Sequence, residues 1–163
     1  MAMLTDQEIY KKWLAKFPGP KYLKPKRWAE ISKVIKSHEV KTVIEFGSGV
    51  STMLFDNRGI TVLSLETDPK YMALVRQMCS PNVTFRYWKN AIIRNYGHFD
   101  LSFVDGILPR TIQTQFAMSC TDLIAIDDMG PRMTALLTPL LGEFTRINTT
   151  DNLLAIYSRS SKK

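Results

Sequence analysis

Five acidic residues stand where short apolar runs end, and they are the residues best suited to chemistry. They are Glu45, Glu66, Asp105, Asp127 and Asp128. The carboxyl ends of parallel strands meet at one edge of a sheet, where α/β folds bind their ligands. Carboxylates gathered at that edge repel one another unless a cation lies among them. The pattern therefore predicts a positively charged ligand, either an organic cation or a divalent metal.

A glycine-rich turn follows the first of these runs. Residues 42–51 read TVIEFGSGVS, a β-branched run and an acid that give way to Gly47 and Gly49. β-branched residues suit a buried strand, and glycine lets a ligand approach the backbone closely. We expect Ser51 or Thr52 to cap the helix that follows. Strand, glycine turn and helix form the first half of a nucleotide-binding unit.

The turn differs from two common nucleotide-binding patterns. Thr52 holds the place of the third glycine of the NAD pattern, and no Gly-Lys-Ser/Thr follows, which excludes a Walker loop. A carboxylate at Glu45 suits a cationic ligand better than a pyrophosphate. Glu66 ends a second predicted strand (61–66), nineteen positions after Gly47. Nucleotide-binding folds place there an acid that accepts hydrogen bonds from the ribose hydroxyls.

The segment Glu45-Phe-Gly-Ser-Gly-Val-Ser51 resembles the first motif of the class I S-adenosylmethionine (SAM)-dependent methyltransferases, an acid and an apolar residue followed by Gly-x-Gly-x-Gly/Ser. The resemblance implies a Rossmann-like sheet over about 42–158 and SAM as the cofactor. It also implies that Glu66 binds the ribose and that Asn90, in the place of the family's adenine-binding Asp, contacts the base. The cofactor site expected from it consists of Glu45, Gly47, Ser48, Gly49, Ser51, Glu66, Asn90 and Asp105.

The later acids suggest how the acceptor would be activated. Asp105, Asp127 and Asp128 follow neighbouring strands, and three carboxylates on one edge suit Mg²⁺. They resemble the metal-binding acids of catechol-type O-methyltransferases, in which the metal acidifies the acceptor hydroxyl. Many such relatives continue Asp-Gly-x-His, whereas this chain reads Asp105-Gly-Ile-Leu-Pro109. The alternatives are that Asp105 contacts the methionine part of SAM and that Asp128 caps a helix. Asp105 or Asp127 is the expected base if the acceptor must lose a proton.

Alternating apolar runs and connections predict an α/β fold that positions these residues. We expect a Rossmann-like, mostly parallel sheet of seven strands with helices on both faces and a C-terminal antiparallel hairpin. The expected strands are 42–45, 61–66, 83–88, 99–106, 122–128, 144–147 and 153–157. The expected helices are 5–16, 25–37, 52–56, 68–78, 109–119 and 130–141.

Positive charge is concentrated before the first strand. Residues 11–41 contain ten Lys and Arg against two acids, which accounts for the whole formal charge of +7. We expect residues 1–41 to form a basic helical segment on a core of 42–163, within a single domain. Its aromatic residues suit nucleic-acid stacking, although their helical spacing favours packing on the sheet. The Pro-Gly-Pro loop with Lys21, Tyr22 and Lys24 is a candidate substrate lid.

The expected function is SAM-dependent methylation, on an oxygen of a small molecule, with Mg²⁺ as a second cofactor. An RNA methyltransferase that uses the basic helices, or a SAM- or nucleotide-binding protein without catalysis, are the alternatives. Two distant cysteines, the lack of a signal peptide and the lack of a membrane-length apolar run favour a cytoplasmic location and no membrane partner. A homodimer is expected because the chain has no inserted cap to enclose an acceptor.

Overall fold

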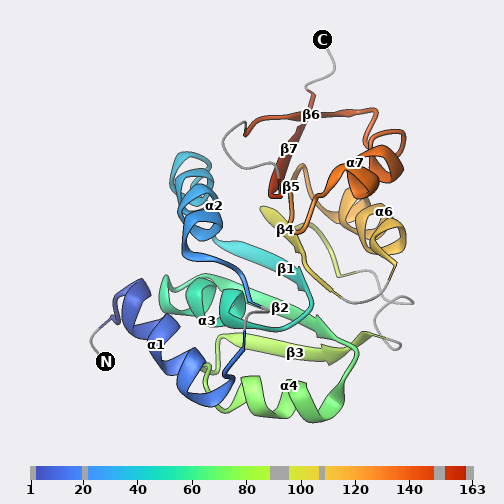
Figure 1. Ribbon diagram of the computed structural model, residues 1–163. Helices are drawn as coiled ribbons and strands as arrows, with labels where there is room; N and C mark the ends of the chain where they lie inside the picture. The colour runs from blue at the N-terminus through green and yellow to red at the C-terminus, as the bar shows by residue number, and fades with distance from the viewer. Residues whose placement is uncertain (1–2, 20–21, 89–95, 107–108, 149–152, 161–163) are drawn as a thin grey trace.

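Seven strands form one sheet in the order β3-β2-β1-β4-β5-β7-β6 (Figure 1). The computed structural model describes residues 3–19, 22–88, 96–106, 109–148 and 153–160. The strands β1 to β5 pair in parallel, and β7 lies antiparallel between β5 and β6. The predicted fold is therefore confirmed. The strands are β1 (Thr42–Phe46), β2 (Thr61–Glu66), β3 (Val83–Tyr87), β4 (Leu101–Val104), β5 (Leu123–Ile126), β6 (Phe144–Arg146) and β7 (Ala155–Arg159).

Helices cover both faces of the sheet, so that the central strands are buried on each side. Successive residues of β1 enter different cores, since Val43 packs with the N-terminal helices while Ile44 packs under the C-terminal ones. A strand buried on both faces reads as a continuous apolar run. The helices are α1 (Asp6–Lys16), α2 (Pro25–Ser37), α3 (Val50–Asn57), α4 (Pro69–Arg76), α6 (Arg110–Cys120) and α7 (Pro131–Leu137).

The two N-terminal helices pack on the core through their aromatic residues. Trp13 and Trp28 are 2% and 1% exposed. The Trp28 indole donates to Asp6 Oδ2 at 2.9 Å, and the guanidinium of Arg58, which also pairs with Asp6, lies 4.5 Å from the Trp28 ring. The Thr5 capping box that opens α1 is confirmed. These indoles are unavailable for stacking on a nucleic acid.

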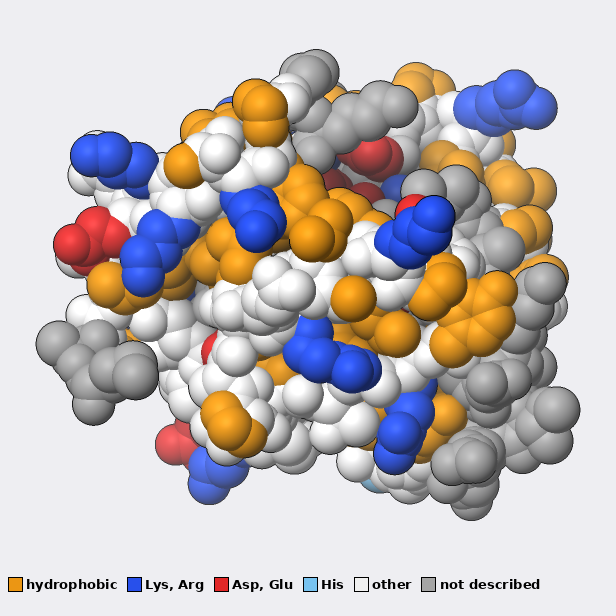
Figure 2. All heavy atoms as spheres, turned by 90° about the horizontal axis from the view of Figure 1, so that it is seen from below, with side chains coloured by type: hydrophobic (Ala, Val, Ile, Leu, Met, Phe, Trp, Pro, Cys, Tyr) orange, Lys and Arg blue, Asp and Glu red, His pale blue; other side chains and the backbone are white. Residues whose placement is uncertain are grey.

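Lysine and arginine side chains are scattered over the face of the molecule on which α1 and α4 lie (Figure 1 and Figure 2). Figure 2 shows them spread singly among apolar and uncharged side chains, with no continuous basic patch on the face in view. The nucleic-acid partner therefore gains no support from this face. Within the described part of the chain, no helix is long and apolar enough to cross a bilayer. The division at residue 41 stays a prediction.

Candidate functional site

A cavity of about 710 Å³ opens where the parallel strands end. Its volume is typical of small-molecule and cofactor sites. The strand ends and the glycine turn form one side, and the N-terminal segment contributes Trp13, Tyr22, Leu23, Lys24 and Arg27 to the other. Part of the predicted lid thus lines the cavity, while residues 20–21 lie outside the described residues. The predicted site residues that line it are Gly47, Ser48, Gly49, Ser51, Glu66, Asp105, Asp127 and Asp128.

The glycine turn is built by close contact between two strand ends. Gly47 has φ +93°, and a Cβ on it would lie 2.9 Å from the Cα of Gly106. Gly49 is the N-cap of α3, and its amide donates to Thr52 Oγ1 at 2.9 Å. The expectation that Ser51 or Thr52 is the N-cap of this helix is wrong, because α3 begins at Val50, two residues earlier than expected, and both hydroxyls donate to Glu45 on β1.

Glu45 is fully buried and holds the turn from beneath. Its carboxylate accepts hydrogen bonds from Ser51 at 2.6 Å, Thr52 at 2.5 Å and Ser64 at 2.8 Å. Burial raises the pKa of Glu45 to about 7, although these three hydroxyl donors act in the other direction. Glu45 is not among the residues that line the cavity. Its expected contact with the cofactor stays a prediction, while its contact with the turn is direct.

Replacing Glu45 with glutamine is expected to flatten the dependence of stability on pH. The pKa of Glu45 rises from 4.5 to about 7 on folding, so the unfolded chain loses this proton first as pH rises. The free energy of unfolding should therefore fall between about pH 4.5 and 7, by up to about 3 kcal/mol. Urea denaturation at pH 5 and pH 8 measures this fall. An equal fall in wild type and Glu45→Gln would contradict the assignment.

Glu66 joins the end of β2 to the glycine turn and faces the cavity. Its Oε1 accepts from the backbone amides of Thr67 at 2.6 Å and Asp68 at 3.0 Å, and its Oε2 accepts from that of Ser48 at 2.9 Å. Among the described residues, Oε2 accepts only this one bond, so it keeps a lone pair for a hydroxyl donor. Asp68 caps α4 as expected, through the amides of Lys70 and Tyr71.

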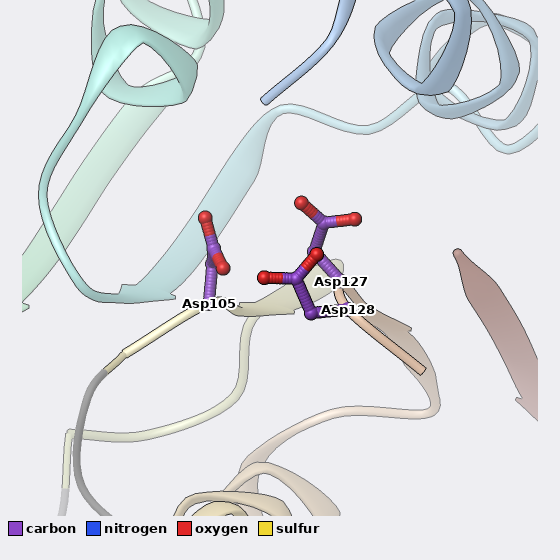
Figure 3. A group of neighbouring side chains, drawn as sticks. All are labelled: Asp105, Asp127 and Asp128. Atoms are coloured by element: carbon purple, nitrogen blue, oxygen red, sulfur yellow. The ribbon is translucent and has the colours of Figure 1, made fainter. Parts of the chain in front are cut away.

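Asp105, Asp127 and Asp128 form an acidic cluster at the ends of β4 and β5 (Figure 3). One carboxylate oxygen of each lies within 4.8 Å of the others. Burial and the negative charge of Asp127 raise the pKa of Asp105 to about 7, while Arg110 acts in the other direction. Burial also raises the pKa of Asp127, against the effect of Arg27. The sequence prediction that these three acids lie close together at the ends of neighbouring strands is confirmed.

Two arginines that sequence reasoning did not identify offset part of the negative charge of this cluster. Arg27 Nη1 donates to Asp127 Oδ1 at 2.7 Å and to Asp128 Oδ1 at 2.9 Å. Arg110 donates to the carbonyls of Val104 at 2.5 Å and Asp127 at 3.0 Å, and to the Asp105 carboxylate at 3.2 Å. Arg110 follows a helix-opening proline after β4, a position that could have marked it. No sequence signal connects Arg27 with β5.

The residues present fit SAM better than they fit Mg²⁺. For SAM, the cavity has a suitable volume, a turn with two glycines in its wall, and the carboxylate acceptor of Glu66 on its surface. For Mg²⁺, one carboxylate oxygen of Asp127 and one of Asp128 already accept from Arg27. A dication placed there would lie against a guanidinium, so the cluster does not suit the ion as it stands. Asn90 lies outside the described residues.

Solved structures match nearly the whole chain, although no family model and no curated protein does. An O-methyltransferase from Bacillus cereus in complex with S-adenosylhomocysteine (SAH) matches at a TM-score of 0.72 and 15% identity, over 94% of this chain and 90% of that one. A candidate O-methyltransferase from Klebsiella pneumoniae matches at a TM-score of 0.75 and 15% identity, over 96% of this chain and 90% of that one. The chain has the class I methyltransferase fold. Magnesium protoporphyrin IX methyltransferase from Synechocystis PCC 6803 with bound SAM also matches, at a TM-score of 0.63 and 15% identity, over 98% of this chain and 100% of that one.

The methyltransferase fold reaches further along the chain than the motif resemblance indicated. That resemblance covered about 42–158, whereas the Bacillus cereus protein aligns with 94% of the chain. The unmatched part of this chain is shorter than half of α1 and α2 together, so most of these two helices must lie in the matched part. The N-terminal helices that line the cavity therefore have counterparts in that structure. At 15% identity the match establishes the fold, and the activity must be argued from the site.

Proposed function

We propose that this protein is a SAM-dependent methyltransferase that acts on an oxygen atom of a small molecule. The observation that carries the proposal is the cavity at the carboxyl edge, where the glycine turn and the Glu66 carboxylate lie side by side. Bound SAM would supply an electrophilic methyl group on a sulfonium. The protein then has to align the acceptor with that methyl group and exclude water, which accounts for much of the rate of such reactions.

The cofactor half of the site would consist of the turn and the acids beside it. Glu66 Oε2 would accept from a ribose hydroxyl, while the backbone of Gly47 and Gly49 would allow close approach. Ser48 and Ser51 also line this wall, and Glu45 keeps it in place from below. Asn90 retains its predicted role at the adenine. A positively charged cofactor also suits an edge with more carboxylates than guanidiniums.

Asp105 is the residue we assign as base for the acceptor hydroxyl. It lies on the cavity wall with its carboxylate partly exposed, whereas the carboxylate of Asp127 is almost fully buried against Arg27. A base whose pKa lies near 7 suits proton abstraction at physiological pH. Trp13, Tyr22 and Tyr71 would shield this region from water. Mg²⁺ has no role in the proposal, and the homodimer stays a prediction.

Thermal-shift titration with SAH tests the cofactor assignment. At a hundredfold excess over Kd, one-site binding adds about 2.7 kcal/mol, which should raise Tm by roughly 5–10 °C. NAD at the same concentration should have no effect. Glu66→Gln should reduce the SAH shift strongly, because both carboxylate oxygens accept from backbone N–H groups and a side-chain NH₂ in either place would face a donor. Asp68→Asn keeps its capping role and should retain the shift. A lack of any shift with SAH would refute the proposal, and SAH binding without turnover of hydroxyl acceptors would reduce it to a binding protein.

A further inference from the structure

The acidic cluster contains an internal cation that comes from a distant part of the chain. Arg27 lies on α2, one hundred residues before Asp127. Its side chain is 11% exposed, and that of Asp127 is 3% exposed. One nitrogen, Nη1, lies between Asp127 Oδ1 at 2.7 Å and Asp128 Oδ1 at 2.9 Å. Charge-assisted hydrogen bonds of this length are the strong ones. The bond to Asp127 is shielded from water, whereas the side chain of Asp128 is 66% exposed.

The backbone at the end of β5 supports this arrangement. Asp128 has φ +56°, one of two positive values for residues other than glycine in the part of the chain that the structure describes. Such backbone strain persists only where the surroundings hold it, and it concentrates at functional sites. Here it accompanies the bond of Asp128 to Arg27.

The charges leave no evident place for a dication. Arg110 donates to the carboxylate of Asp105 and to the carbonyl of Asp127, while Arg27 donates to the carboxylates of Asp127 and Asp128. Three carboxylates thus face two guanidiniums. A divalent ion within the cluster would gain the carboxylates but would meet two positive charges at close range, where burial weakens the screening. A dication that displaced Arg27 would have to break two short charge-assisted hydrogen bonds, one of them to a buried carboxylate.

We propose that Arg27 is a positioning residue that replaces a divalent metal at the acceptor side of the site. Its guanidinium holds Asp127 and Asp128 in place and closes the cluster to metal ions. Asp105 is then the carboxylate left to meet the acceptor without metal assistance. The inference rests on the proposed methyltransferase function, but the closure of the cluster to metal can be measured without any turnover.

Direct Mn²⁺ binding, followed by electron paramagnetic resonance of the free ion, tests the inference. Wild type should bind no Mn²⁺ at millimolar concentrations. Arg27→Met should acquire one site whose Mn²⁺ affinity is at least about tenfold higher than the upper limit measured for wild type. Lys26→Met removes the same charge from the neighbouring, exposed position on α2 and should behave as wild type. Adding Asp128→Asn to Arg27→Met should abolish the new site, which would locate it in the cluster.

Arg27→Gln provides the same comparison with a smaller change in packing, should Arg27→Met not fold by circular dichroism. Tight Mn²⁺ binding by wild type, or equal Mn²⁺ affinity in wild type and the folded charge-removing variant, would overturn the inference. The SAH titration separates the two proposals. If SAH binds and wild type also binds Mn²⁺, the methyltransferase proposal survives and the role of Arg27 does not. If SAH fails to bind, the proposed methyltransferase function is refuted, whatever the Mn²⁺ measurement shows.

Discussion

Replacing Gly47 with alanine is expected to abolish SAH binding and to lower the free energy of unfolding by about 3 kcal/mol. Gly47 adopts φ +93°, where an L side chain is strained, and its new Cβ would lie 2.9 Å from the Cα of Gly106 and 3.0 Å from the carbonyl oxygen of Asp105. Both contacts are with backbone, which cannot rotate away. The turn would therefore have to separate from β4, and the cavity wall would move with it.

Gly59→Ala is the matched control for this experiment. Gly59 also has a positive φ, +71°, but nothing lies within 4 Å of the position where its Cβ would be. Alanine there should cost only about 1–2 kcal/mol of backbone strain and should leave SAH affinity intact. Urea denaturation and isothermal titration with SAH measure both quantities. If the two variants lose the same stability and both still bind SAH, the close contact of the turn is not what shapes the cofactor wall.

Replacing Asp105 with asparagine is expected to reduce kcat by about 10²–10⁴-fold, the usual contribution of a positioned general base. The amide is close in size to the acid and can still accept from Arg110, so the cluster should keep its shape. SAH affinity should change far less than kcat. Single-turnover methyl transfer to a hydroxyl acceptor, with SAH titration alongside, separates the two effects.

The pH profile gives this prediction a second readout. Burial and the charge of Asp127 raise the pKa of Asp105 to about 7. A base must be deprotonated to act, so kcat/KM of wild type should rise with pH through about 7 and level off above it. Asp105→Asn should lose that rise. Asp68→Asn, at an acid that also lines the cavity but caps α4, should keep both kcat and the rise. A full rise in the absence of Asp105 would assign the base elsewhere.

Much of the fold could be predicted because its signals are local. The capping box at Thr5, the proline that opens α2 and the apolar runs of the strands each act over a few residues, and the structure places these elements as expected. The ends of the elements were less well predicted. β4 spans Leu101–Val104 rather than 99–106, and α7 ends at Leu137 rather than 141. At these ends tertiary contacts, not propensity, decide where the regular hydrogen bonding stops.

The charge balance of the site could not be predicted for a related reason. The strand-end acids could be placed on one edge because topology alone brings them there. Their partners could not, since Arg27 is far from β5 in sequence and lies on a helix whose other basic side chains are largely exposed. The contact of Glu45 with the glycine turn could not be predicted either, while its expected contact with the cofactor stays a prediction. Its three hydroxyl donors come from the helix and strand beside it, and no spacing rule distinguishes them from solvent-facing residues.

The position of β7 has a consequence for the order in which the protein can fold during synthesis. β6 pairs with β7 alone, and β7, made after it, enters between β6 and β5. Until residues 155–159 leave the ribosome, β5 has an open edge and β6 has no strand to join. An open edge invites pairing with other chains. The carboxylates after β5 therefore acquire their final support late in translation, and a chain stalled before Ala155 would expose the strand on which the site is built.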